Sequence, residues 1–128
     1  MEKPLEDLVR ARARGRCEYC HYPRPPFHFE HIIAIKHGGP TREDNLAFAC
    51  MKCNFHKGPN IAGIDPQTQR IVPLFHPRKD KWRDHFHWRG NLLIGLTPVA
   101  RATIAVLEIN QPFRMQARER LRAEGGSG

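Results

Sequence analysis

Four cysteines are the residues whose spacing most directly indicates chemistry. They form two Cys-x-x-Cys pairs, Cys17 with Cys20 and Cys50 with Cys53, in a chain of 128 residues. Four thiolates fill the coordination sphere of one tetrahedral ion, so the pattern predicts a structural zinc site. Two disulfides are disfavoured in a chain without a secretory signal, and a redox pair does not explain two pairs. Zinc would hold residues 17–53 together as one unit.

Polar residues with catalytic potential lie between and just after the two cysteine pairs. The chain reads Glu-His-Ile at 30–32, Gly-Gly at 38–39 and Asn-Leu at 45–46, and Asn54 follows the second pair. Taken singly, each has an ordinary explanation as a solvated acid, a surface histidine, a turn residue or a helix cap. Taken together, they offer two kinds of group. The neutral imidazole can accept a proton from water, and the side-chain oxygens are ligands of the kind that Mg²⁺ or Mn²⁺ prefers.

This set of residues resembles the HNH endonucleases in order and spacing. The family's pattern runs acid-His-Ile near a strand end, Gly-Gly in a loop, Asn-Leu before the next strand, and Cys-x-x-Cys-His/Asn-x-x-Lys leading into a helix. The resemblance covers residues 17–57, and residues 60–110 also look like the C-terminal half of stand-alone bacterial proteins with this domain. It implies a ββα-metal core and hydrolysis of DNA to 5′-phosphate and 3′-hydroxyl ends.

The resemblance also implies a role for each polar residue. His31 would be the general base, and Asn45 would brace the loop and orient His31 through hydrogen bonds. Glu30 and Asn54 would be the catalytic residues that bind one Mg²⁺ or Mn²⁺ ion, with His56 as a rival ligand. Glu30 stands where aspartate is commoner and Asn54 where histidine also occurs. Neither change suggests an inactive enzyme.

The elements that must position these residues can be predicted from the positions of glycine and proline and from hydrophobic periodicity. Residues 4–14 favour a helix that ends at Gly15, and the apolar runs 27–35 and 46–49 favour two strands, followed by a short helix starting near Cys53.

Residues 60–124 indicate further elements. An edge strand is expected at 71–75, and residues 82–89 and 92–96 favour a hairpin around Gly90 and Asn91, with His87 facing Ile94 and His85 facing Leu96. Thr97 would cap a helix that runs to about residue 109, and a last helix is expected at about 111–122, with Asn110 as its candidate cap.

We therefore predict an α+β protein with a zinc-stapled ββα-metal (HNH) core. Residues 1–59 would form the core with its N-terminal helix. Residues 60–124 would form an extension, a β-hairpin plus two helices, packed on the core, and residues 125–128 a flexible linker-like tail. No apolar run is long enough to span a membrane, and we expect a cytoplasmic monomer.

Basic residues outnumber acidic ones by 21 to 13, and most of the surplus lies beyond residue 53, which suggests a polyanionic partner such as DNA. A solvated basic surface without a partner is the alternative. The residues expected to contact phosphates are Lys57, Arg83, Arg89, Arg114, Arg118 and Arg122.

The function predicted from these features is that of a metal-dependent endonuclease that nicks DNA. A zinc-dependent module that binds nucleic acid without cutting it is the second hypothesis, and an RNA-cutting toxin nuclease is the third. An acid next to a histidine argues against pure binding, because an acid repels phosphate unless a metal ion intervenes.

Overall fold

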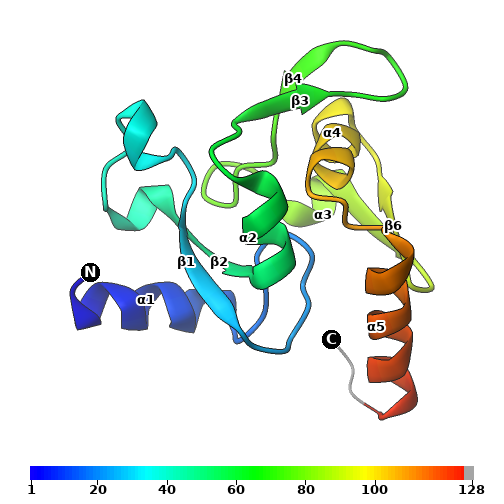
Figure 1. Cartoon of the computed structure of the whole chain (residues 1–128), viewed down its shortest axis with the longest axis horizontal. Coiled ribbons are helices and arrows are strands. Elements are labelled where there is room, and N and C mark those ends of the chain that lie inside the picture. Colours follow the sequence, from blue (N-terminus) through cyan, green and yellow to red (C-terminus); the bar gives the residue numbers. More distant parts are fainter. Residues whose placement is uncertain (126–128) are drawn as a thin grey trace.

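Two antiparallel strands and a helix form the middle of the first half of the chain. In the computed structural model, which describes residues 1–125, β1 (Phe27–His31) pairs with β2 (Leu46–Cys50), and α2 (Met51–Lys57) follows β2 directly (Figure 1). The short helical turns η1 (Ile35–His37) and η2 (Glu43–Asn45) lie in the connection between the strands. This ββα arrangement agrees with the predicted core, although α2 begins two residues before the predicted start.

Helices cover both sides of the strand pair. All five residues of β2 are buried, because α1 (Lys3–Ala13) packs on β2 from one side and α2 contacts both strands. Val9 and Ala13 of α1 pack with Leu46 and Phe48 of β2. The small side chains of β2 that alternate with these residues belong to the larger core of the molecule. Because side chains alternate along a strand, the two faces of β2 pack into two different hydrophobic clusters.

Up to residue 125, the second half of the chain contains two hairpins and three helices. β3 (Ala62–Ile64) pairs with β4 (Ile71–Pro73), and β5 (Phe86–Arg89) pairs with β6 (Leu92–Gly95). The remaining helices are α3 (Trp82–His85), α4 (Pro98–Val106) and α5 (Pro112–Ala123). In the part of the chain that is described, the strands form three separate two-stranded sheets.

The hairpin β5–β6 has the predicted register at its centre but a shorter first strand. His87 faces Ile94 as predicted. Residues 82–85 form the helical turn α3 instead of extending the strand, and the contact with Leu96 is a backbone hydrogen bond from its N–H to the carbonyl of His85 (2.8 Å). The turn places Trp82 where its Nε1–H donates to the carbonyl oxygen of Tyr19 (2.8 Å).

Two predicted helix ends also need correction. Thr97 caps α4 as predicted, with its hydroxyl accepting from the N–H of Ala100 (3.1 Å), but α4 ends three residues before residue 109. The cap residue of α5 is Gln111 and not Asn110. The amide of Asn110 instead bonds both backbone groups of Leu93 in β6, so it ties the helix connection to the hairpin.

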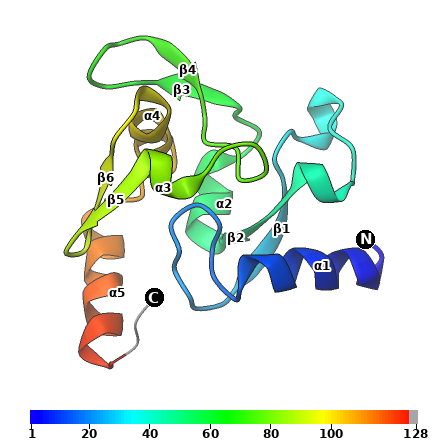
Figure 2. The ribbon, with the colours of Figure 1, turned by 180° about the vertical axis from the view of Figure 1, so that it is seen from behind.

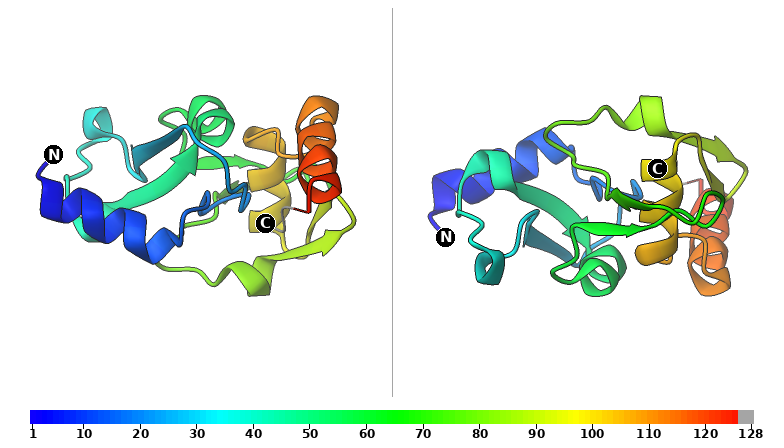
Figure 3. Two further views of the ribbon diagram at one scale, coloured as in Figure 1. Left: turned by 90° about the horizontal axis from the view of Figure 1, so that it is seen from below. Right: turned by 90° about the horizontal axis from the view of Figure 1, so that it is seen from above.

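One hydrophobic cluster joins the two halves. It contains the four cysteines and Ala47 and Ala49 from the first half, and Phe75, Phe86 and other apolar residues from the second. Figures 2 and 3 show α4 and α5 at the end of the molecule opposite to the start of α1. None of the helices in residues 1–125 is long and apolar enough to cross a membrane. Of the predicted tail, residues 126–128 lie outside the described part of the chain.

Candidate functional site

The four cysteines meet in a buried cluster, as predicted. Their Sγ atoms all lie within 4.8 Å of one another, and those of Cys20 and Cys50 are 3.7 Å apart. Zn–S bonds of about 2.3 Å in a tetrahedron place two sulfurs about 3.8 Å apart, so the residues present fit a zinc ion. Backbone N–H groups of Cys20 and Cys53 also point at the sulfurs of Cys17 and Cys50, respectively, which stabilises thiolates.

Arg114 reaches this cluster from α5. One of its guanidinium nitrogens lies 3.0 Å from Sγ of Cys53, and the other donates to the carbonyl oxygen of Leu107 (2.6 Å). Burial disfavours the charge on Arg114, but the thiolates of Cys53 and Cys20 outweigh burial and raise its pKa above the ordinary value. The prediction of Arg114 as a phosphate contact is therefore wrong, because its charge is used inside the protein.

Arg118 is also buried. Its guanidinium donates to the carbonyl oxygens of Asn91 and Ile109 (both 2.9 Å) and packs over the ring of Trp88. Arg114, Arg118 and Arg122, all predicted to contact phosphates, follow one another at four-residue spacing along one stripe of α5, but Arg114 and Arg118 are buried. Only Arg122 of this stripe is exposed.

His31 is the last residue of β1, and its side chain is partly exposed. Its Nε2 lies 2.8 Å from Oγ1 of Thr41, an exposed residue of the connection between the strands. The chain bends directly after His31, at residues 32 and 33. The imidazole is thus held at a strand end that solvent can reach. Thr41 was not singled out by the sequence, since a threonine in a loop has no distinctive pattern.

Glu30 points to the other face of β1, where it is buried. Its two carboxylate oxygens lie 2.6 Å from the hydroxyl of Tyr19 and 2.6 Å from Nζ of Lys57. Burial raises the pKa of Glu30, and the nearby Lys57 ammonium and Tyr19 hydroxyl oppose this shift. The pKa of Tyr19 is raised well above its usual range, first by burial and then by the charge of Glu30.

These contacts correct two predictions. Glu30 is covered by Tyr19 and Lys57 and is not an open metal ligand in this structure. Lys57 is only 1% exposed, and its ammonium also donates to the carbonyl oxygen of Ile32 (2.8 Å), so it is not a phosphate contact. We call Glu30, Lys57 and Tyr19 the buried clamp. It fixes the residues on both sides of His31, because Glu30 precedes His31 and Ile32 follows it.

Asn45 braces the same segment from the loop side. Its side chain accepts from the N–H of Ile33 (2.9 Å) and donates to the carbonyls of Ile33 (3.0 Å) and Pro40 (2.8 Å). The backbone carbonyl of Asn45 accepts a hydrogen bond from the N–H of Ile32 (2.8 Å). The loop approaches so closely that a Cβ at Gly39 would overlap the carbonyl of Ile33, which explains the need for glycine there. The asparagine acts on the backbone beside His31 and not on its ring.

The other predicted metal ligands lie on α2. Asn54 is partly buried there. Nδ1 of the rival ligand His56 lies 3.1 Å from a carboxylate oxygen of Glu108, so His56 has a partner in the second half of the chain. With Glu30 covered, the structure does not assemble the oxygen-rich pair that was predicted for Mg²⁺ or Mn²⁺.

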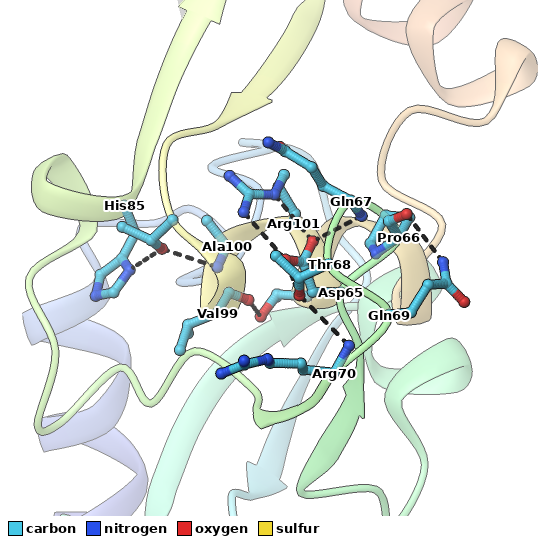
Figure 4. Close-up of polar contacts among 12 residues, drawn as sticks. Asp65, Pro66, Gln67, Thr68, Gln69, Arg70, His85, Val99, Ala100 and Arg101 are labelled. Atoms are coloured by element: carbon cyan, nitrogen blue, oxygen red, sulfur yellow. Dashed lines mark hydrogen bonds and ion pairs between the residues drawn. The ribbon is translucent and has the colours of Figure 1, made fainter.

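A second buried polar network lies in the second half of the chain (Figure 4). The carboxylate of Asp65, after β3, receives two hydrogen bonds from Arg101 of α4 (2.9 and 3.0 Å) and one from the hydroxyl of Thr68 (2.8 Å). The Arg101 guanidinium holds the pKa of Asp65 well below its usual range. The network joins the β3–β4 turn to α4 and leaves no free group for chemistry, so its role is structural.

A ββα core with a four-cysteine cluster defines the class of protein, and the comparison with known families agrees. The family model HNH endonuclease matches residues 17–60, which include the cysteines, β1, β2, α2 and His31. No curated protein and no solved structure matches the chain. Residues 17–60, about a third of the chain, are thus similar to the HNH endonuclease domain.

Proposed function

We propose that this protein is an endonuclease that hydrolyses phosphodiester bonds in DNA, with His31 as the general base. The observation that carries the proposal is the way His31 is held. Its ring is partly exposed and bonded to Thr41, while the backbone on either side is fixed by the buried clamp and by Asn45. Such fixed placement of a proton acceptor beside solvent is what general-base catalysis requires.

The proton transfer can be assigned to one ring nitrogen. If Nε2–H donates to Oγ1 of Thr41, the lone pair of Nδ1 is free to accept the proton of the attacking water. The water oxygen then forms a bond to phosphorus and the bond from phosphorus to O3′ breaks. O3′ takes up a proton from solvent, which leaves 5′-phosphate and 3′-hydroxyl ends. Thr41 is a positioning residue in this scheme, because it orients the ring without touching the substrate.

HNH nucleases use divalent metal ions, which supply positive charge to the phosphate in the transition state. The structure does not offer Glu30 for this purpose, and no step of the proposal passes through a Mg²⁺ or Mn²⁺ ion held by it. Asn54 is the oxygen ligand that remains from the predicted pair. The cleavage assay with different metal ions measures the requirement directly.

DNA is the proposed substrate because exposed basic residues remain after the corrections above. Arg83 and Arg89 are exposed around β5, and Arg122 is exposed on α5. The formal net charge of +8 favours a polyanion bound through its backbone. A protein that binds nucleic acid without cutting it is the second candidate, because Lys57 neutralises Glu30 and the acid beside His31 no longer argues against simple binding.

The test is cleavage of supercoiled plasmid with Mg²⁺, with Mn²⁺ or without added metal, and of a matched RNA. His31→Ala should lower the rate by at least roughly 100-fold and leave the melting temperature and DNA affinity unchanged. His28→Ala is the matched control, since His28 is an exposed histidine of the same strand, and it should cut like the wild type. Full activity of His31→Ala would refute His31 as the general base, and a wild type that binds DNA without cutting it would leave the binding module in place of the nuclease. Faster cutting of RNA would replace DNA as substrate.

Thr41 offers a finer measurement. Thr41→Ala should lower the turnover rate and change its pH profile, and Thr41→Ser should restore both because it keeps the hydroxyl. Equal activity of the three proteins would contradict the assigned role of Thr41 without affecting that of His31.

A further inference from the structure

A pocket of about 470 Å³ lies between three segments that are far apart in the sequence. They are the loop 16–23, the turn of the β5–β6 hairpin with neighbouring aromatic residues, and α5 (Figure 2). The volume falls within the range of about 300–1,000 Å³ that is usual for small-ligand sites. His31, Asn45 and Asn54 are not among its lining residues, so this pocket is separate from the candidate active site.

Aromatic rings form much of the pocket wall. Trp82, Trp88, Tyr22 and His21 all line it. His21 stacks on Trp82 with ring centroids 3.8 Å apart and an interplanar angle of 22°, and Trp82 lies 6.1 Å from Trp88. Since Nε1 of Trp82 is also bonded to the backbone of Tyr19, the ring is fixed before any ligand arrives. Fixed rings bind flat ligands at a low cost in entropy.

The remaining wall is basic. Arg16, Arg118 and Arg122 line the pocket, and no acidic residue does. Arg118 is held over the ring of Trp88, at 5.4 Å from its centroid. Arg122 is exposed and bonds the side-chain oxygen of Asn91 at the hairpin turn (2.8 Å). Rings beside arginines suit a ligand that combines a flat heterocycle with a negative charge, which is the chemistry of a nucleotide.

We propose that this pocket binds an unstacked base of a nucleic acid strand, with Arg16 and Arg122 beside its phosphates. The inference rests on the proposed function for the presence of nucleic acid, and it adds a second point of contact away from His31. Because stacking accepts every base, the pocket would favour single-stranded or opened DNA over duplex without reading a particular sequence.

The probe is a labelled short oligodeoxythymidylate, compared with a strand of equal length and charge whose sugars carry no bases. Binding is measured by fluorescence anisotropy without added Mg²⁺ or Mn²⁺. One stacked base changes affinity by roughly 5- to 150-fold, so the wild type should prefer the thymidylate strand by at least about 5-fold. Trp88→Leu and Tyr22→Leu should remove this preference and leave the affinity for the abasic strand unchanged.

Phe55→Leu is the control, because Phe55 is an aromatic residue of α2 that is 76% exposed and lies outside the pocket. It should keep the preference. Tyr22→Leu also covers the case in which Trp88→Leu fails to fold. Equal affinity of the wild type for the two strands would overturn the proposal that the pocket binds a base. The proposed nuclease activity would not be affected, because plasmid cleavage tests it separately. Preference for bases that survives in both folded pocket variants would also overturn it.

Discussion

The buried clamp can be tested by replacing Lys57 with methionine, which keeps most of the aliphatic volume and removes the charge. Lys57 is 1% exposed and Glu30 is 6% exposed, so water cannot take the place of the lost ammonium. Removing one partner of a buried ion pair costs about 3–5 kcal/mol of unfolding free energy. The bond to the carbonyl of Ile32 is lost as well. For a chain of this size we expect the melting temperature to fall by roughly 10 °C or more.

A second substitution separates the ion pair from simple packing. In the double variant Glu30→Gln with Lys57→Met, no unpaired charge remains, and the glutamine can still bond Tyr19. The double variant should therefore be more stable than Lys57→Met alone, by about 1–2 kcal/mol. Urea unfolding of the wild type, Lys57→Met, Glu30→Gln and the double variant gives the complete double-mutant cycle. All four proteins are measured with zinc bound and no other divalent ion added.

The same proteins distinguish a clamp residue from a metal ligand. If Glu30 serves only the clamp, the stabilisation of the protein by added Mn²⁺ is the same for the wild type and Glu30→Gln. An unchanged melting temperature of Lys57→Met would refute the clamp. A Mn²⁺-dependent stabilisation that disappears in Glu30→Gln would restore Glu30 as a metal ligand.

Three further predictions concern the rest of the molecule. Arg101 holds the pKa of Asp65 below its ordinary value of 3.8. The contribution of Asp65 to stability is therefore present above pH 3.8 and is lost as pH falls through the lower pKa of the folded protein. The unfolding free energies of the wild type and Asp65→Asn should converge at acid pH. A difference that is constant from pH 7 to strong acid would contradict this. Strong chelation, or Cys50→Ser, should unfold the core, as circular dichroism would show, since zinc binding of order 10 kcal/mol is coupled to folding; an unchanged melting curve after verified zinc loss would disprove a structural site. Arg114→Met should speed zinc release to a colorimetric chelator, whereas Arg120→Met, an exposed arginine of the same helix, should not, and equal rates would contradict the Arg114 contact with Cys53.

Features that depend on neighbours in the sequence could be predicted. The spacing of the cysteines predicted their cluster, and the Gly-Asn turn predicted the pairing of His87 with Ile94. Thr97 followed by proline predicted the helix cap. In each case the geometry is set within a few residues or by a metal ion of known preference.

Features that depend on distant partners could not be predicted. Because side chains alternate along a strand, Glu30 and His31 lie on opposite faces of β1, but this alternation does not show that Lys57 and Tyr19 cover one of these faces. The alternation of residues 82–89 suggested a continuous strand. A helical turn forms there instead, and the indole of Trp82 bonds the carbonyl of Tyr19, 63 residues away in the sequence. Local preference is weak enough for such tertiary contacts to override it.

The position of the basic residues shows why net charge alone overstates the basic surface that is available to a polyanion. A zinc ion with four thiolates keeps two negative charges in the interior, where uncompensated charge is costly. Arg114 and Arg118 lie on the buried side of α5. The thiolates raise the pKa of Arg114 against the effect of burial, whereas burial lowers the pKa of Arg118 and the thiolates oppose this shift only in part. Lys57 compensates Glu30 in the same way. Three of the six residues predicted to contact phosphates thus neutralise buried charge or satisfy buried carbonyls, and of these six only Arg83, Arg89 and Arg122 are exposed and available for the proposed contact with DNA.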